Sequence, residues 1–172
     1  MIQRTIKTAL IFLIFPVILF LQSCSYSLRG ASIPVEMKTI TIQFFENNST
    51  LVVPYLSQDF TEALKERIRN QTRLSVQNAD GDAIFEGRIT DYSIRPVAVQ
   101  GNERAGLSRL TITVNVKYTN TLKPEQSFEQ SFTRFRDLDL ARQALQVQER
   151  SLIPLINDEL TEDIFNRAFA NW

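Results

Sequence analysis

Apolar and polar positions alternate along several stretches of the chain, which predicts half-buried β-strands. Residues 38–45 place Ile40, Ile42 and Phe44 on one face. Residues 107–120 alternate most regularly, and their apolar members all face one way: Leu110, Ile112, Val114, Val116 and Tyr118. The intervening side chains are polar and mostly threonine. The pattern therefore predicts a sheet with one buried face and one polar face.

Three further stretches are predicted to be strands. Residues 74–76 form a short one. Residues 83–94 form a long one whose alternation changes phase near Thr90 or Asp91, which indicates a β-bulge or a strong twist. Residues 126–135 follow the 107–120 strand after five residues that include Pro124, so the two strands should pair antiparallel. Residues 96–106 are expected to form a loop.

Two segments change to a helical period. In residues 54–70, apolar side chains recur every three or four positions, and Pro54 suits a first helical turn. From residue 137 onward a second helix is expected, and Pro154 should kink it or split it in two. Its acidic residues are expected to lie on the outer side of the helix: Glu149, Asp158, Glu159, Glu162 and Asp163.

The order of elements predicts the fold class. The first helix should join two strands through a right-handed crossover. Both helices should then cover one face of a small four-stranded mixed sheet, in the order β-α-β-β-β-α. We therefore expect a single α+β domain at residues 36–172.

The first 23 residues have a different pattern, with basic residues, then an apolar run, then small or polar residues. This order is typical of a secretory signal peptide, and the apolar run is short for a membrane-spanning helix. Residues 21–24 resemble a bacterial lipobox, so we expect cleavage before Cys24 and lipid attachment there, with palmitate a typical acyl chain. Residues 24–35 would be a tether. The alternative is an ordinary secretory signal with an accidental cysteine.

Composition restricts the chemistry. The chain has no histidine and one cysteine, which excludes histidine-dependent catalysis and the usual zinc sites. Removing residues 1–23 leaves 17 basic against 19 acidic residues, a net charge of −2, which argues against a nucleic-acid binder. A carboxylate-pair hydrolase remains an alternative, although the acidic residues are dispersed along the helices. We expect no enzymatic activity, no cofactor and no metal site.

The polar face of the sheet and the arginines near the 96–106 loop have two interpretations each. The face is either solvated or a contact surface for a larger assembly or a polar lipid headgroup. Arg95, Arg104 and Arg109 are either solvated or candidate contacts for phosphate groups, for which guanidinium geometry is well suited.

Four stretches make the chain resemble the LPS-assembly lipoprotein LptE family: CSYSLRG at 24–30, KTITIQFFEN at 38–47, DAIFEGRI at 82–89 and IFNRAFANW at 164–172. The resemblance implies two helices on a four-stranded mixed sheet. It also implies an outer-membrane lipoprotein that plugs an LptD-like LPS-insertion β-barrel, assists the assembly of that barrel, binds lipopolysaccharide and has no enzymatic activity. The alternative is a generic outer-membrane lipoprotein adaptor with another envelope protein as partner.

Overall fold

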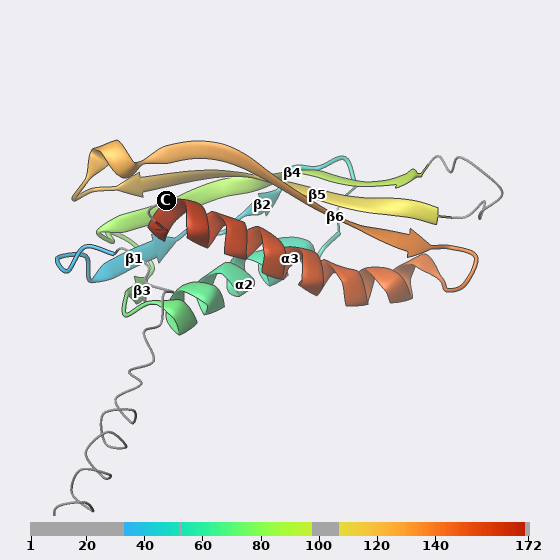
Figure 1. Ribbon diagram of the computed structural model, residues 1–172, viewed down its shortest axis with the longest axis horizontal. Helices are drawn as coiled ribbons and strands as arrows, with labels where there is room; N and C mark the ends of the chain where they lie inside the picture. The colour runs from blue at the N-terminus through green and yellow to red at the C-terminus, as the bar shows by residue number, and fades with distance from the viewer. Residues whose placement is uncertain (1–32, 52, 98–106, 171–172) are drawn as a thin grey trace, which may run out of the picture. The chain divides into compact units, whose positions relative to one another are not determined.

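The computed structural model describes residues 33–51, 53–97 and 107–170. The predicted signal peptide, Cys24 and most of the predicted tether lie outside these residues. Two helices, α2 (Leu56–Gln71) and α3 (Leu145–Phe169), lie on one side of a twisted sheet (Figure 1). This arrangement confirms the predicted α+β class and the placement of both helices on one face. No helix in the described part of the chain is long and apolar enough to cross a membrane.

The sheet contains six strands among the described residues, so the prediction of four is wrong. β1 (Thr39–Ile42) pairs in parallel with β3 (Ser75–Gln77) and with β4 (Ala83–Pro96). The count of four left out the short strand that the pattern predicted at residues 74–76, which the structure has as β3. It also omitted β2 (Glu46–Asn47), which pairs in parallel with β4. Two residues are too few for alternation to reveal a strand.

The long antiparallel part of the sheet follows the sequence pattern closely. β4 pairs with β5 (Leu107–Asn120), and β5 pairs with β6 (Phe128–Asp139). The register of β4 on β5 shifts between Ile89 and Asp91, where the phase change predicted a bulge. A short 3-10 turn, η1 (Pro124–Gln126), precedes β6, so this strand begins and ends later than predicted.

The core lies between the sheet and the helices. The five apolar side chains of β5 named above are at most 1% exposed. Phe45 is fully buried and packs edge-on against Phe60, with ring centroids 5.1 Å apart, whereas Phe44 is 58% exposed. The prediction that Phe44 faces the core is therefore wrong. β1 ends at Ile42, and the alternation does not continue through the irregular backbone that follows.

Helix α3 begins at Leu145 and not near residue 137, because Leu138 still belongs to β6 and is buried with the core. Pro154 lies inside one continuous helix, so the helix is not split in two.

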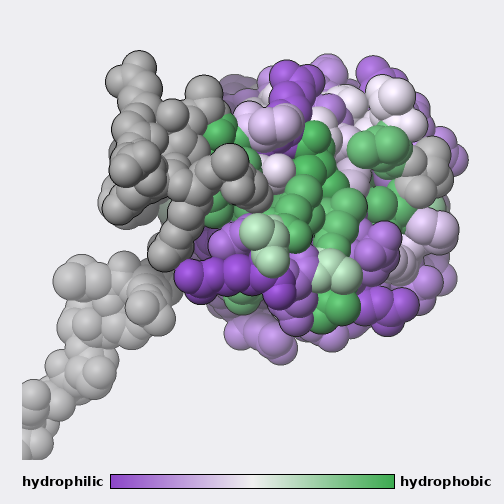
Figure 2. Space-filling model, turned by 90° about the vertical axis from the view of Figure 1, so that its right-hand side faces the viewer, coloured by the Kyte–Doolittle hydropathy of each residue, from purple (hydrophilic) through white to green (hydrophobic). Residues whose placement is uncertain are grey.

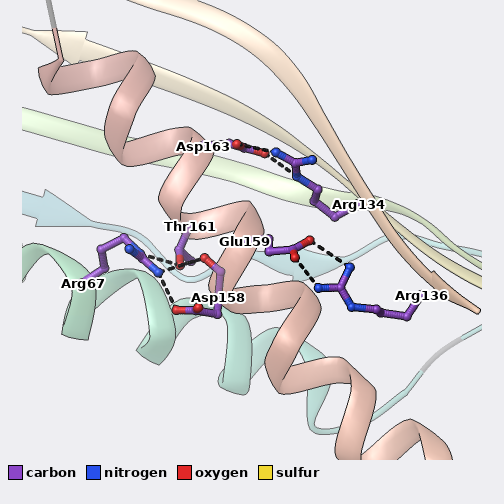
Figure 3. Close-up of polar contacts among 7 residues, drawn as sticks. All are labelled: Arg67, Arg134, Arg136, Asp158, Glu159, Thr161 and Asp163. Carbon is purple, nitrogen blue, oxygen red and sulfur yellow. Dashed lines mark hydrogen bonds and ion pairs between the residues drawn. The ribbon is translucent and has the colours of Figure 1, made fainter.

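Ion pairs join α3 to the neighbouring elements (Figure 3). Arg134 of β6 donates two hydrogen bonds to Asp163, at 2.7 and 2.6 Å, and Arg136 pairs with Glu159. Arg67 of α2 pairs with Asp158. Asp158 remains 72% exposed, whereas Glu159 and Asp163 are only partly exposed beside β6, so the expected outer position is wrong for those two carboxylates.

A candidate interaction surface on the uncovered sheet face

Figure 1 shows that α2 and α3 leave one face of the sheet uncovered. The side chains that β4, β5 and β6 present on that face are mostly polar. Alternation places every second side chain of each strand there. From β5 these are Arg109, Thr111, Thr113, Asn115, Lys117 and Thr119, half-buried apart from the exposed Lys117. The register places Glu129, Ser131, Thr133, Phe135 and Asp137 of β6 beside them.

Many polar side chains on this face bind one another across neighbouring strands. The hydroxyl groups of Thr113 and Thr133 lie 2.9 Å apart and share a hydrogen bond. Lys117 Nζ donates to Glu86 Oε1 at 2.5 Å, and this contact raises the pKa of the lysine. Such directly opposite pairs stabilise a sheet and hold its side chains in fixed positions. The face is therefore ordered, polar and close to neutral.

One end of this face is different, because an aromatic ring is exposed there beside an ion pair. Arg109 donates to Asp137 through Nε at 2.7 Å and through Nη2 at 3.1 Å. Its guanidinium carbon also lies 3.9 Å from the ring centroid of Phe135, which is 45% exposed. The hydrogen bonds from Arg109 hold the pKa of Asp137 below its usual range and raise the pKa of the arginine.

The predicted phosphate-contacting arginines lie at the same end. Arg95 and Arg109 are directly opposite each other in the β4–β5 register. Arg95 is exposed and has no ion-pair partner among the described residues, whereas Arg109 is paired with Asp137. Arg104 lies outside the described residues, as does Cys24.

Apolar side chains reach the surface at this end of the molecule, between polar ones (Figure 2). In the segment from the end of β6 to the start of α3, Leu140 is 44% exposed and Val147 is 52% exposed. Leu107 at the start of β5 and Ile94 near the end of β4 are only partly buried. Exposed apolar groups therefore lie at the same end of the sheet as the two opposed arginines.

Sequence reasoning missed Phe135 and Asp137 as members of this surface. The predicted second helix began at residue 137, which excluded Asp137 from β6. Continued alternation past Phe132 would have placed both residues on the polar face, and this was the available signal. No group of three or more Cys, Asp or Glu side chains in the described ranges is close enough to hold a metal ion.

Several solved bacterial proteins share this fold. An uncharacterized lipoprotein B from Nitrosomonas europaea is 17% identical, with a TM-score of 0.52 over 82% of this chain and 88% of that one. A minor lipoprotein from Acinetobacter baumannii is 14% identical, with a TM-score of 0.50 over 76% of this chain and 91% of that one. A hypothetical protein from Chlamydia trachomatis is 9% identical, with a TM-score of 0.51 over 78% and 99% of the two chains. At these identities the likeness concerns the fold alone.

No curated protein matches the sequence significantly. A family model does: residues 37–168 match the model described as LptE, lipopolysaccharide-assembly. The match begins just before β1 and ends one residue before the end of α3, so it includes every strand and both helices described above. The chain therefore belongs to the LptE family of lipopolysaccharide-assembly proteins.

Proposed function

We propose that this protein is a lipid-anchored outer-membrane lipoprotein of lipopolysaccharide export, which fills the lumen of an LptD-like β-barrel, assists its assembly and binds lipopolysaccharide. Family membership supports the general role. The observation that carries the specific proposal is the long, polar face of β4, β5 and β6, which neither α2 nor α3 covers.

This face suits a barrel lumen for a physical reason. The interior of an outer-membrane barrel is polar, so a domain inside it must present hydrogen-bonding groups rather than an apolar surface. The threonines of β5 and the hydroxyl groups of Ser131 and Thr133 in β6 supply such groups, and the ion pairs between strands keep the net charge of the face low.

Lipopolysaccharide binding is proposed for the end of the sheet that carries the opposed arginines. A lipid A headgroup is anionic and its acyl chains are apolar. Arg95 offers a guanidinium group with no ion-pair partner in the described part of the chain, and Leu140 and Val147 offer apolar surface at the same end. Guanidinium groups bind phosphate oxygens through paired hydrogen bonds. Arg104 is proposed as a second candidate in addition to Arg95.

The membrane anchor is proposed to be Cys24. A diacylglyceryl group on its sulfur and an acyl chain on its nitrogen would together bind a bilayer stably, whereas a single chain binds only marginally. Ser25 follows the cysteine, which is compatible with the outer membrane. The domain would then work from the periplasmic side without enzymatic activity.

The test is affinity purification of the full-length protein from its own membranes, with a photoreactive residue at Thr113 in the centre of the polar face. Mass spectrometry should identify a large outer-membrane β-barrel as the dominant crosslinked protein. Recovery of a different envelope protein as the dominant partner would favour a generic adaptor over a barrel plug. Replacement of Cys24 by alanine should release the protein from membranes.

A further inference from the structure

A groove lies between α2 and α3, on the opposite side of the molecule from the polar sheet face. Its volume is about 660 Å³. Both helices contribute to its walls, and most of the lining side chains are acidic or neutral polar. The contact between Arg67 and Asp158, two of the lining residues, is visible in Figure 3. Nothing in the proposed barrel contact uses this groove.

The groove carries excess negative charge. Five carboxylates line it: Asp59, Glu62, Glu66, Asp158 and Glu162. Among the described residues, Arg67 is the only basic one that lines the groove, and its guanidinium is already held by Asp158 and by the hydroxyl of Thr161 at 2.9 Å. Lys65 neutralises the charge of Glu62, with Lys65 Nζ 2.8 Å from Glu62 Oε1. Within the described ranges, Asp59, Glu66 and Glu162 form no ion pair.

Asn157 gives the second, independent observation. This lining residue is 2% exposed, and its side-chain oxygen Oδ1 has no hydrogen-bond partner in the part of the chain that the structure describes. A buried carbonyl oxygen without a donor is unfavourable, so such atoms usually have a partner. Solvated helix faces explain exposed carboxylates, but they do not explain this buried oxygen.

Pro154 interrupts the hydrogen-bond ladder of α3 beside the groove. It lines the groove one helical turn before Asn157, and it has no N–H to donate to the carbonyl oxygen of Arg150. The side chain of Arg150 does not compensate the acidic rim, because its guanidinium lies over the ring of Tyr55 at 6.0 Å. The groove thus combines an excess of carboxylates with the buried Oδ1 of Asn157, and the side-chain amides of Asn70 and Gln71 also line it.

We propose that this groove binds the guanidinium group of an arginine side chain from a partner protein. A guanidinium group has five N–H donors, no acceptor and a permanent positive charge, so it matches a site made of acceptors and carboxylates. It is also weakly hydrated, which suits a partly buried site. A divalent cation fits less well, since no three acidic residues in the described chain converge as ligands would.

The direct test uses the full-length protein in detergent, labelled on its side-chain amides and followed by NMR. The probe is a blocked Gly-Arg-Gly peptide, and the control is the same peptide with citrulline, the neutral counterpart of arginine. The arginine peptide should shift the Asn157 amide signal in a saturable way, and the citrulline peptide should not. Equal binding of both peptides, or no saturable shift, would overturn the proposal. Saturation by MgCl₂ that displaces the arginine peptide would assign the site to a cation instead.

Two variants and a control locate the binding. Asn157→Leu removes the buried acceptor while keeping the side-chain size, and the pair Asp59→Asn with Glu162→Gln removes rim charge. Each should weaken the arginine peptide at least fivefold, as read from the side-chain amide signal of Asn70, which lines the groove and is present in every variant. Glu125→Gln, in the exposed η1 turn, is the matched control and should leave affinity unchanged. If Asn157→Leu and the rim pair also leave it unchanged, the groove does not bind the peptide.

A measurement in membranes tests the protein partner. A photoreactive residue at Ala63, which lines the groove, should crosslink to a protein segment that contains an arginine. Crosslinks to lipid alone, or none, would overturn the inference. This result is separable from the barrel contact, which is tested at Thr113 on the opposite sheet face.

Discussion

Arg109 and Asp137 form a two-pronged ion pair across β5 and β6, with Nε–Oδ1 at 2.7 Å and Nη2–Oδ2 at 3.1 Å. The arginine also covers the exposed ring of Phe135. Arg95 of β4 lies opposite Arg109 in the β4–β5 register, and it has no ion-pair partner within the described residues. The charge of Arg109 is therefore neutralised by a carboxylate, whereas no described residue neutralises the charge of the neighbouring Arg95.

This difference predicts unequal roles in lipopolysaccharide binding. Arg95→Ala should weaken binding roughly threefold to tenfold, because it removes an unpaired guanidinium that can contact phosphate. Arg109→Ala should have a smaller effect, because its charge is already neutralised by Asp137. Binding of lipopolysaccharide to the purified full-length protein measures both. Arg69→Ala on α2 is the control, and a larger loss for Arg109→Ala than for Arg95→Ala would contradict the assignment.

The same pair predicts an acid-sensitive contribution to stability. Hydrogen bonds from Arg109 lower the pKa of Asp137 below its ordinary value of 3.8, so the folded state binds the proton less readily than the unfolded state. The contribution is therefore fully present above that value and is lost as pH falls through the lower, folded pKa. Asp137→Asn should be slightly less stable than the parent near neutral pH. The difference should shrink in urea unfolding curves recorded below about pH 4, and a constant difference down to pH 2 would contradict the mechanism.

Two buried tyrosines predict a loss of stability at alkaline pH. Burial and a hydrogen bond to Glu149 raise the pKa of Tyr92 above its ordinary value of 10.0, and burial raises the pKa of Tyr118 to about 12. A tyrosine whose pKa is higher in the folded state contributes its full stability at pH values below its pKa in the unfolded state. This contribution is lost as pH rises from the unfolded-state pKa through the folded-state pKa. The free energy of unfolding should therefore fall between about pH 10 and 12.

Replacing each tyrosine by phenylalanine checks this cause. Tyr92→Phe and Tyr118→Phe should each flatten the decline above pH 10, since the removed hydroxyl can no longer titrate. At pH 7, Tyr92→Phe should also cost about 1–3 kcal/mol, because the partner carboxylate of Glu149 loses a donor. Tyr26→Phe, outside the domain predicted at residues 36–172, is the control. An unchanged alkaline slope in both core variants would assign the decline to other groups.

The strands were predictable where alternation is long and uninterrupted. Residues 107–120 were predicted with the bounds that β5 has, and the phase change in the preceding strand located the bulge at Ile89 and Asp91. Phe44 was misplaced because its strand ends at Ile42, and alternation carries no information beyond a strand. The two-residue β2 is below the length at which any pattern is readable.

The partners of charged residues were not predictable, because they are distant in sequence. Arg109 meets Asp137 28 positions later, and Arg67 meets Asp158 91 positions later. Composition alone indicated only that charges were balanced. Asn157 likewise looked like an ordinary helical position, and its isolation became visible only once α2 and α3 were packed together.

Gly87 predicts a strict requirement for glycine in the middle of β4. A Cβ atom there would lie 2.1 Å from the carbonyl oxygen of Asn115 and 2.7 Å from Cε1 of Phe45. Gly87→Ala should therefore lower the free energy of unfolding by at least about 1–3 kcal/mol, since the backbone of β5 cannot move away easily. Thr111→Ala, on the polar face of β5, is the control and should be nearly neutral. Equal urea midpoints for the two variants would contradict this account of the packing.

The ion pair between Arg136 and Glu159 predicts that reversing one charge weakens the packing of α3 on β6 and that reversing both restores it. Arg136→Glu places two carboxylates in contact between β6 and the helix, and it should destabilise the fold by about 1 kcal/mol, the scale expected for a partly exposed pair. Adding Glu159→Arg restores opposite charges and should recover most of that loss. The coupling energy from the double-mutant cycle, measured by urea unfolding, isolates the pair from other effects of each change. If the double variant is as unstable as the two single losses added together, the contact contributes nothing to holding α3 on the sheet. The neighbouring pair of Arg134 and Asp163 would then be the principal ionic link between β6 and the helix.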